Sequence, residues 1–517
     1  MNPSQALVGE DPKPLVSRPI VPSLLLFLTV LAGLLLLLSR ISTTQAARNF
    51  RKQHGCEPVR ARVPLKDPIW GLDFIYEHLT AFREKRSLEA GANRFRTLGH
   101  TFAVDGLVRS ISTTDPENIK SILSVNFKDY SHKGRQTLMK PLLGSGIFAS
   151  DGKEWAHSRA MLRPNFTKDQ VADLDVVGRH VSHLIDAIPR NTTIDLQPLL
   201  LQFTLDSATE FLLGHSTNGL VHGDGEGVAF GAAFEASLKD IAYQFRLGPF
   251  RYLQWSRRNA RDNYATCQRY VDRFVRRAMD LRKAESADDE RNCFLKELAK
   301  SNEPEERIRD ELLNILLAGR DTTASLLASF FFLVARRPDV WKKLRNEVNK
   351  LEGCSPTYKQ LREMKFVRYC LNETLRLYPP VPGSGKVAVR DTVLPRGGGP
   401  DGDKPVYVPK GSFVNYAIYA MHRRQDFYGL DADEFRPERW ETCRPSWEYL
   451  PFNGGPRICL GQQYALTESM LVVIKFAQQF SCIISEDSRP WTENLGLTMC
   501  VGNGVLVSFP SEAQQTR

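Results

Sequence analysis

The spacing of apolar positions predicts a chain that is helical along most of its length. One helix is expected where Asp115 can act as the cap and Pro116 fits the first turn. Alternating apolar runs, which are typical of strands, are fewer and shorter, at residues 98–113, 387–395, 404–416 and 497–509. The pattern therefore predicts one mainly α-helical domain with small β-sheets.

The longest predicted helix begins at about Asn302 and ends before Pro338. At about 1.5 Å per residue it would be roughly 50 Å long, which is enough to cross a domain. Its second half is apolar on nearly all sides and should be buried. Residues 318–323, "AGRDTT", interrupt this pattern with two charges and two hydroxyls. Either this stretch lines a polar cavity, or Arg320 and Asp321 have structural partners.

An uncharged run of nineteen residues, 20–38, predicts a transmembrane anchor near the N-terminus. At about 1.5 Å per residue it would span roughly 28 Å, whereas the apolar core of a cleaved signal peptide is normally only about 7 to 15 residues. The flanking basic residues are two before the run and four after it: Lys13, Arg18, Arg40, Arg48, Arg51 and Lys52. This asymmetry predicts that the downstream part of the chain is cytosolic.

The order of these features predicts four parts of the chain. Residues 1–19 form a lumenal N-terminus, 20–38 the anchor, 39–75 a linker punctuated by proline, and 76–517 a single catalytic domain. No internal repeat or linker-like composition divides the last part. We also expect the protein to be a monomer.

Charge and cysteine content narrow the function classes. The net charge of +10, from 69 Lys and Arg against 59 Asp and Glu, fits a membrane surface, an acidic protein partner or an ordinary solvated surface. The basic residues are dispersed and form no nucleic-acid-binding motif, which argues against nucleic acid as a partner. Nine cysteines, an odd number without a Cys-x-x-Cys pair, argue against a disulfide framework and a zinc site.

Cys459 lies between a glycine-rich loop and a strongly helical run. Free N–H groups at a helix start favour a thiolate over a thiol. Gly455 and Gly461 allow the backbone to approach a flat group, Pro456 stiffens the loop, and Arg457 can face an anion. A thiolate, close backbone and a cation together suit an iron porphyrin with acidic side groups. The alternative is a buried, inert cysteine beside a turn.

The positions Phe452, Gly455, Arg457, Cys459 and Gly461 together resemble the heme-binding signature F-x-x-G-x-R-x-C-x-G of cytochrome P-450. The resemblance implies the cytochrome P-450 fold, with a single heme domain behind the transmembrane helix. It also implies heme b (iron protoporphyrin IX) as cofactor, with Cys459 as the axial metal ligand and the other four residues around the cofactor.

Two further patterns agree with this resemblance. Glu373 and Arg376 resemble the family's E-x-x-R, which implies a buried triad with Arg439 that steadies the heme loop; as an isolated pair they would contribute only about 0.2 to 0.5 kcal/mol. Trp155 and Arg159 resemble the family's W-x-x-x-R, which implies contact with a heme propionate; alone they would suggest an ordinary amphipathic helix.

The resemblance also gives the polar interruption a function. It implies that Asp321 and Thr322 are the catalytic acid and alcohol that manage protons at bound dioxygen, with Gly319 loosening the helix. The implied enzyme is a monooxygenase that uses O2 and takes electrons from NADPH through NADPH-cytochrome P-450 reductase. One oxygen atom enters an unactivated C–H bond of a lipophilic substrate, and the other leaves as water.

Several stretches resemble the fungal branch that hydroxylates alkanes and fatty acids, among them "FTLDSATEFLLG" and "AGRDTTA". The implied substrate pocket includes Ala318, Val381, Gly385 and Met499. This branch tends to carry V-P-x-N-x-R-x-A, whereas this chain reads "VPGSGKVA", so that Gly385 removes bulk and Lys386 replaces a forked arginine with a point charge. Two substrate classes therefore stay open: an alkyl chain, and a bulkier polyketide or terpenoid of fungal secondary metabolism.

Other heme-thiolate functions make different demands on the sequence. Reductase-independent isomerases and dehydratases typically lack the acid and alcohol that Asp321 and Thr322 supply, and a heme sensor needs no proton relay. The resemblance and the anchor together predict the endoplasmic reticulum membrane, with a single pass and a cytosolic catalytic domain. The N-glycosylation sequons at Asn165, Asn191 and Asn372 should then be silent.

Overall fold

The computed structural model divides the chain into two compact units, residues 1–56 and 57–517. It describes residues 44–67, 70–106, 109–166, 174–222, 225–247, 257–283 and 294–510. In the first unit, residues 44–53 are helical. The predicted lumenal segment and the predicted anchor at 20–38 lie outside the described residues.

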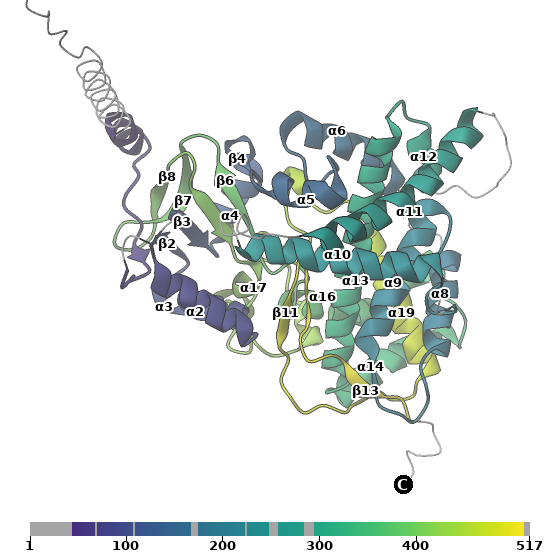
Figure 1. The fold of residues 1–517 in the computed structure, drawn as a ribbon. Coiled ribbons are helices and arrows are strands. Elements are labelled where there is room, and N and C mark those ends of the chain that lie inside the picture. Colours follow the sequence, from purple (N-terminus) through teal and green to yellow (C-terminus); the bar gives the residue numbers. More distant parts are fainter. Residues whose placement is uncertain are drawn as a thin grey trace, which may run out of the picture. The chain divides into compact units, whose positions relative to one another are not determined.

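Helices make up most of the second unit, as the apolar spacing predicted (Figure 1). The α-helices before the longest one are α2 (Leu72–Arg83), α3 (Ser87–Leu98), α4 (Pro116–Lys120), α5 (Arg135–Leu143), α6 (Gly152–Leu162), α8 (Leu174–Asp186), α9 (Leu196–Leu213), α10 (Glu226–Leu247), α11 (Arg258–Lys283) and α12 (Phe294–Ala299). The later ones are α13 (Glu305–Val334), α14 (Pro338–Val348), α15 (Tyr358–Glu363), α16 (Lys365–Leu377), α17 (Ile418–Met421), α18 (Gln425–Tyr428) and α19 (Gln462–Gln479).

The loops contain short 3-10 and π-helical turns. They are η1 (Ser121–Val125), η2 (Phe127–Asp129), η3 (Arg163–Phe166), η5 (Asn349–Leu351), η6 (Pro437–Glu441) and η7 (Gly455–Arg457). Of these, η1 is a π-helix, and the others are 3-10 helices. The glycine-rich loop before Cys459 contains η7.

The strands form small sheets, also as predicted. The largest has the order β1-β2-β3-β9-β6-β4, from Ala61–Arg62, Thr101–Asp105, Arg109–Thr113, Phe413–Tyr416, Ser384–Ala388 and Tyr130–Ser131. The others are β10-β13-β5 (Ile484–Ser485, Leu506–Ser508, Ile194–Asp195), β11-β12 (Glu493–Leu495, Met499–Val501) and β7-β8 (Thr392–Gly398, Lys404–Val408). Each sheet except the β11-β12 and β7-β8 hairpins joins segments that are distant in the sequence.

The predicted linker ends earlier than the sequence indicated. Residues 61 and 62 pair with β2, Glu57 and Val59 form bridges to the β7-β8 hairpin, and α2 begins at Leu72. The second half of residues 39–75 is therefore part of the folded unit rather than a linker. A two-residue strand is too short to leave a recognisable alternation of apolar and polar positions.

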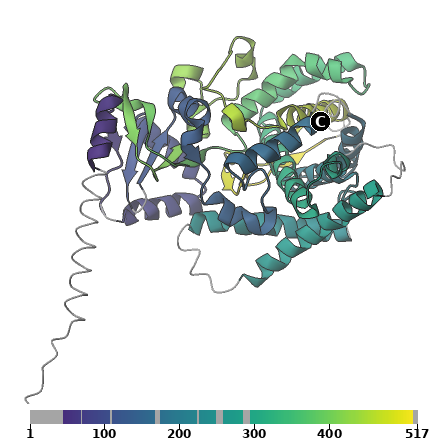
Figure 2. The same ribbon diagram turned by 90° about the horizontal axis from the view of Figure 1, so that it is seen from above.

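The helix α13, labelled in Figure 1, confirms the long helix expected between residues 302 and 338; Figure 2 shows the same ribbon from above. It packs against α9, α11, α16 and α19, and its second half lies in the largest apolar core. Among the described residues it is the one helix whose length and composition would allow it to cross a membrane, and most of it is buried inside the protein. A core position explains its apolar character.

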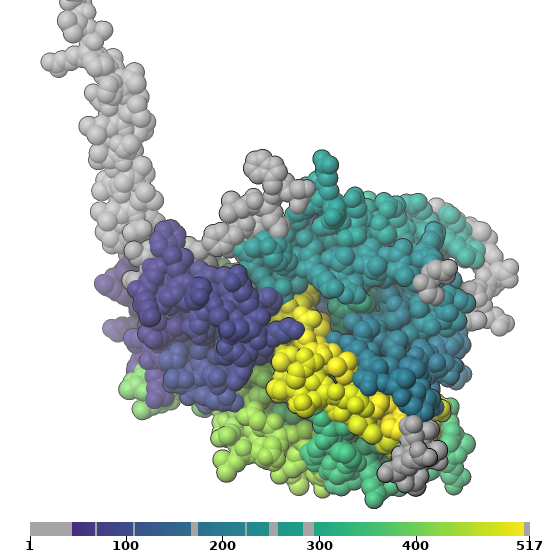
Figure 3. All heavy atoms as spheres, turned by 60° about the horizontal axis from the view of Figure 1, so that its bottom comes forward, coloured from purple at the N-terminus to yellow at the C-terminus, as the bar shows by residue number. Residues whose placement is uncertain are grey.

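Local signals behave as physical chemistry predicts. The carboxylate of Asp115 accepts hydrogen bonds from the backbone N–H groups of Glu117 (2.9 Å) and Asn118 (3.2 Å), with Pro116 in the first turn of α4. Near the C-terminus, the carboxylate of Glu493 accepts from the N–H groups of Ser87 and Leu88 at the start of α3. Figure 3 shows the final strands on the surface between the purple N-terminal segments and the blue helices.

Candidate active site

The loop before Cys459 is held by its own backbone and by the neighbouring π-helix. The N–H of Cys459 donates to the carbonyl of Phe452 (3.0 Å). Gly455 has φ +66°, and a Cβ there would lie 2.0 Å from the carbonyl oxygen of Leu123 in η1. Glycine is required at this position because of both the backbone angle and the close approach.

The second glycine of the signature differs from the first. Gly461 precedes α19 with φ −85°, and a Cβ there would meet only the ring of Phe166, at 3.5 Å. Protein atoms therefore approach Gly455 closely, through a carbonyl group of η1, and approach Gly461 less closely. The approach of both glycines to a flat group stays a prediction.

The thiol of Cys459 lies in a mixed environment. Its side chain is accessible to solvent yet surrounded at depth by protein, and this desolvation raises the pKa of the thiol. The backbone N–H of Gly461 and the charge of Arg159 act in the opposite direction. Both features that favour a thiolate at the start of a helix are thus present.

The three residues predicted to face the heme carboxylates lie together, with the guanidinium groups of Arg457 and Arg159 beside the ring of Trp155. The guanidinium of Arg457 is 4.4 Å from the centre of the Trp155 ring, and that of Arg159 is 6.0 Å from it. Arg159 also donates to the carbonyl of Ile458 (2.9 Å), one residue before the cysteine. Trp155 and Arg159 come from one face of α6, as their spacing implied.

Three more basic residues, which the sequence did not assign to this site, face the same region: Lys386, Arg135 and His132. Lys386 of β6 is 2% exposed; its Nζ lies 3.4 Å from the carbonyl of Ile122 and 4.8 Å from the Phe127 ring centre. Burial, with Arg457 and Arg135, lowers the pKa of Lys386 to about 7. The same charges, with burial, strongly lower the pKa of His132.

These groups fit a porphyrin with acidic side groups. In the part of the chain that the structure describes, Asp151 is the carboxylate that offsets the charges of Lys386, Arg135 and Arg457. The Nδ1 atom of His132 is buried without a hydrogen-bond partner. Buried cations in excess of buried anions are costly unless an anion binds beside them. Heme, with its two carboxylates, meets that demand.

The middle of α13 is less buried than the stretches on either side of it. Ala318, Gly319, Asp321 and Thr322 are half-buried, whereas residues 311–317 and 323–332 are buried throughout. The polar interruption found in the sequence therefore coincides with a break in the packing around the helix.

The two predicted catalytic side chains of α13 both have intrahelical partners. The hydroxyl of Thr322 donates to the carbonyl of Ala318 (2.5 Å). Asp321 pairs with Arg320 (2.8 Å), which also reaches Glu235 of α10 (3.4 Å). Burial raises the pKa of Asp321 and Arg320 opposes the shift. The charges therefore have structural partners, as one of the two interpretations expected, and the polar cavity stays a prediction.

The predicted triad is assembled and buried. Glu373 receives two hydrogen bonds from Arg376 (2.9 and 2.8 Å) and one from Arg439 (3.3 Å). Trp440 and the backbone N–H of Arg436 complete the set of donors, at 3.0 and 3.1 Å. The triad thus joins α16 to η6.

The predicted pocket residues differ in their surroundings. Val381 is 39% exposed, and Ala318 is half-buried, so both face open space. Met499 is fully buried, and its carbonyl accepts a hydrogen bond from Ser325 of α13. A Cβ at Gly385 would lie 2.0 Å from the ring of Phe413. That ring takes up the room that we expected at Gly385.

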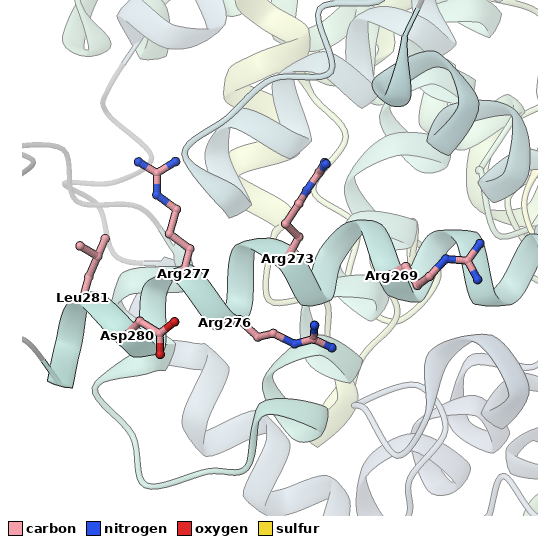
Figure 4. Close-up of a pocket in the computed structure, with 6 residues that line it drawn as sticks. All are labelled: Arg269, Arg273, Arg276, Arg277, Asp280 and Leu281. Atoms are coloured by element: carbon pink, nitrogen blue, oxygen red, sulfur yellow. The ribbon is translucent and has the colours of Figure 1, made fainter.

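Two hollows lie elsewhere on the described surface. One, about 740 Å³, lies along α11 between Arg269, Arg273, Arg276, Arg277, Asp280 and Leu281 (Figure 4). Its guanidinium groups point in different directions (Figure 4). Arg276 lies 4.0 Å from Glu305. The other, about 530 Å³, lies behind the cysteine loop between Phe452, Ile458, Asn372 and neighbouring residues.

Comparison with known proteins gives the family of this site. A family model for cytochrome P450 matches residues 77–505, which include Cys459 and both patterns around it. The chain belongs to the cytochrome P450 family. It is therefore a heme-thiolate monooxygenase that uses O2 and takes electrons from NADPH through a reductase partner.

Relatives of this cytochrome P450 cover nearly its whole length. It is 54% identical to the cytochrome P450 monooxygenase FPY7 of Fusarium mangiferae, over 91% of this chain and 93% of the relative. Identity to the cytochrome P450 monooxygenase himC of Aspergillus japonicus is also 54%, over 92% and 89%. Identity to cytochrome P450 52A3-B of Candida maltosa is 42%, over 79% and 83%.

Proposed function

We propose that this cytochrome P450 binds heme b through Cys459 and oxidises an unactivated C–H bond of a lipophilic fungal metabolite. The observation that carries the assignment is the environment of Cys459. An accessible sulfur lies at the start of α19, beside Arg159 and Arg457 and an excess of buried positive charge. When bound, the heme supplies the iron that activates O2.

The chain's own residues would hold the heme by its carboxylates. Arg457, Arg159 and Trp155 are the predicted holders, and Lys386 and Arg135 add buried positive charge from two other segments. A bound carboxylate would offset charges that, among the described residues, Asp151 balances. Phe452, Gly455 and Gly461 shape the loop that carries the cysteine.

Asp321 and Thr322 of α13 would handle protons during the reaction. The hydroxyl of Thr322 is 2.5 Å from the Ala318 carbonyl, and rotation about one bond would free it for a donor role towards oxygen. Burial raises the pKa of Asp321, and Arg320 opposes this shift. A carboxyl group at this position can act as a proton donor or acceptor.

The substrate class follows from similarity and from the pocket. Identity is 54% to two monooxygenases of filamentous fungi and 42% to a yeast cytochrome P450 52A protein. This difference favours a secondary metabolite such as a polyketide or terpenoid over an alkyl chain. Val381 and Ala318, which face open space, are the proposed substrate contacts. Phe413 fills the space at Gly385, and Met499 is buried, so these two residues would act on the substrate through their neighbours.

The proposed cellular setting is the endoplasmic reticulum membrane. The uncharged run at residues 20–38 and the excess of basic residues after it support a single-pass anchor with a cytosolic catalytic domain. A cytosolic domain is within reach of the reductase, whose acidic surface would meet a chain with net charge +10. We propose that the protein works there as a monomer.

The test of the ligand is the spectrum of the reduced carbon monoxide complex. The wild-type protein should show the red-shifted Soret band of thiolate ligation, and Cys459→Ala should abolish it. Cys354→Ala, which changes an exposed cysteine, should leave the band intact. If Cys459→Ala retains the band, the assignment of the ligand is wrong. Incubation with a panel of alkanes, fatty acids, polyketides and terpenoids then decides the substrate class by product analysis.

A further inference from the structure

The segment between α5 and α6, residues 143–151, is bound to α13 along several residues of its backbone. We call it the α5–α6 segment. Its N–H groups at Ser145, Ile147 and Phe148 donate to Asp310 (2.8 Å), Glu311 (3.0 Å) and Asn314 (2.9 Å), respectively. In return, Asn314 donates to the carbonyl of Leu143 (2.8 Å) and Arg307 to that of Ser145 (2.8 Å).

This contact leaves no room between segment and helix. A Cβ at Gly144 would lie 1.8 Å from Asp310, and one at Gly146 would lie 2.1 Å from Asn314. The three acceptor side chains are buried, and burial raises the pKa of Asp310 and of Glu311. Each buried backbone donor thus has its own acceptor on α13.

The other end of the segment is bound to the cysteine loop. The guanidinium of Arg457 donates to the carbonyl of Ser150 (3.0 Å) and to the carboxylate of Asp151 (2.5 Å). The same carboxylate accepts from the N–H of His132 (2.8 Å). Arg457 precedes Cys459 by two residues, so the segment joins α13 directly to the loop of the metal ligand.

The side chains of α13 that hold the segment share a helix face with its catalytic residues. Arg307, Asp310, Glu311 and Asn314 are spaced by three and four residues, and the same spacing continues to Ala318, Asp321 and Thr322. Arg307 also donates to the hydroxyl of Ser158 in α6 (2.5 Å), which lies between Trp155 and Arg159 in the sequence. One face of α13 therefore contacts both the segment and the helix that carries two heme-facing residues.

We propose that Asp310, Glu311 and Asn314 are positioning residues of the monooxygenase. By fixing the α5–α6 segment on α13, they set where Arg457 and α6 stand relative to Asp321 and Thr322. This inference rests on the proposed function, because the groups whose distance is set are the holders of the heme carboxylates and the proton-handling pair. A loop bound at both ends transmits a displacement of one end to the other, since close-packed protein deforms little.

Pairs of substitutions separate positioning from simple stability. Glu311→Leu removes the acceptor of the Ile147 N–H, whereas Glu311→Gln keeps an oxygen for it. Asn314→Leu keeps the branched shape of the side chain but removes both an acceptor and a donor. Leu344→Ala, in the buried core at α14, is the matched control because it lowers stability without touching the segment.

The measurements use the purified full-length holoenzyme. They are the melting temperature, the carbon monoxide Soret band, the heme propionate bands in the resonance Raman spectrum, and the rate of heme transfer to apomyoglobin. We expect Glu311→Leu and Asn314→Leu to keep the thiolate band, shift the propionate bands and release heme about tenfold faster, as for the loss of one well-placed hydrogen bond. Glu311→Gln should keep the propionate bands and the heme release rate of the wild type, but with a lower melting temperature, because it loses the ion pair with Arg307 (3.2 Å). Leu344→Ala should lower the melting temperature alone.

The outcomes distinguish the two proposals. If the leucine variants lower only the melting temperature, as Leu344→Ala does, the positioning role is refuted while the heme assignment stands. If the wild-type protein lacks the thiolate band, the proposed function itself fails. Should Asn314→Leu not fold, Gly146→Ala tests the same contact from the segment's side, because its Cβ would displace Asn314. Unshifted propionate bands in that variant would also refute the proposal.

Discussion

Glu373→Gln tests how strongly the buried triad stabilises the protein. The two carboxylate oxygens of Glu373 accept five donors: Nε and Nη2 of Arg376, Nε of Arg439, the indole N–H of Trp440 and the backbone N–H of Arg436. Glutamine has the same shape but offers one acceptor oxygen and an amide that is itself a donor. Several donors would therefore face another donor.

The magnitude follows from burial. Arg376 is fully buried and Arg439 is 6% exposed, so both would keep their charge in the interior without the carboxylate. Removing one partner of a buried ion pair costs roughly 3 to 5 kcal/mol. Remaining contacts reduce the loss, since Arg376 still donates to the carbonyls of His422 and Ala432, and Arg439 still pairs with Asp431. We therefore expect about 3 kcal/mol, a large part of a typical stability of roughly 5 to 15 kcal/mol.

The assay is urea unfolding of the holoenzyme, followed by circular dichroism and by the carbon monoxide Soret band. The midpoint should fall for Glu373→Gln with an unchanged dependence on urea, and heme content after expression should drop. The control is Glu438→Gln in the neighbouring η6 turn. Glu438 pairs with Lys343 at 2.6 Å, with side chains 31% and 55% exposed, so its loss should cost below about 1 kcal/mol. Equal effects of the two substitutions would refute the reasoning.

Three further predictions concern protons, charge and topology. Thr322→Ala should retain heme and divert NADPH-derived electrons to hydrogen peroxide, whereas Thr323→Ala, which changes a buried hydroxyl without a partner among the described residues, should leave coupling unchanged; peroxide per NADPH measures this. Burial lowers the pKa of Lys386 from 10.5 to about 7, so between those pH values only the unfolded chain binds this proton. The free energy of unfolding of the heme-free chain should therefore rise with pH in this range, and a Lys386→Met variant with the same dependence of that free energy on pH would contradict this. Endoglycosidase treatment of microsomes should not change the gel mobility of the protein, because neither the exposed sequon at Asn191 nor the buried one at Asn165 should carry a glycan; a mobility change that is lost on substitution of Asn191 would show a lumenal domain.

Elements and local pairs could be predicted because their signals lie close together in the sequence. The cap of α4 at Asp115, the length of α13 and the Glu373–Arg376 pair each depend on residues within a few turns of one another. The cysteine loop could be predicted for the same reason, since the pattern from Phe452 to Gly461 is contiguous.

The rest of the site depends on contacts that leave no periodic signal. Ser145 and Asp310 are 165 residues apart, and no local pattern indicates that a backbone N–H in one segment will meet a carboxylate in the other. The sequence also does not show which side chain of a neighbouring strand will lie over a given residue. Gly385 suggested free space, but Phe413 on the neighbouring strand fills it. Lys386 was noticed as a substitution, yet its burial beside Arg135 and Arg457 required the fold.

The order of synthesis gives the α5–α6 segment a further consequence. Asp151 leaves the ribosome 306 residues before Arg457, its partner. At about 5 to 20 residues per second, this interval is roughly 15 to 60 s. Throughout it, neither the loop of Cys459 nor Arg457 exists. The protein therefore cannot bind heme through Cys459 until this interval has passed. Heme supply thus acts on chains that already carry the cysteine loop, and not on the shorter nascent chains in which the α5–α6 segment still lacks Arg457.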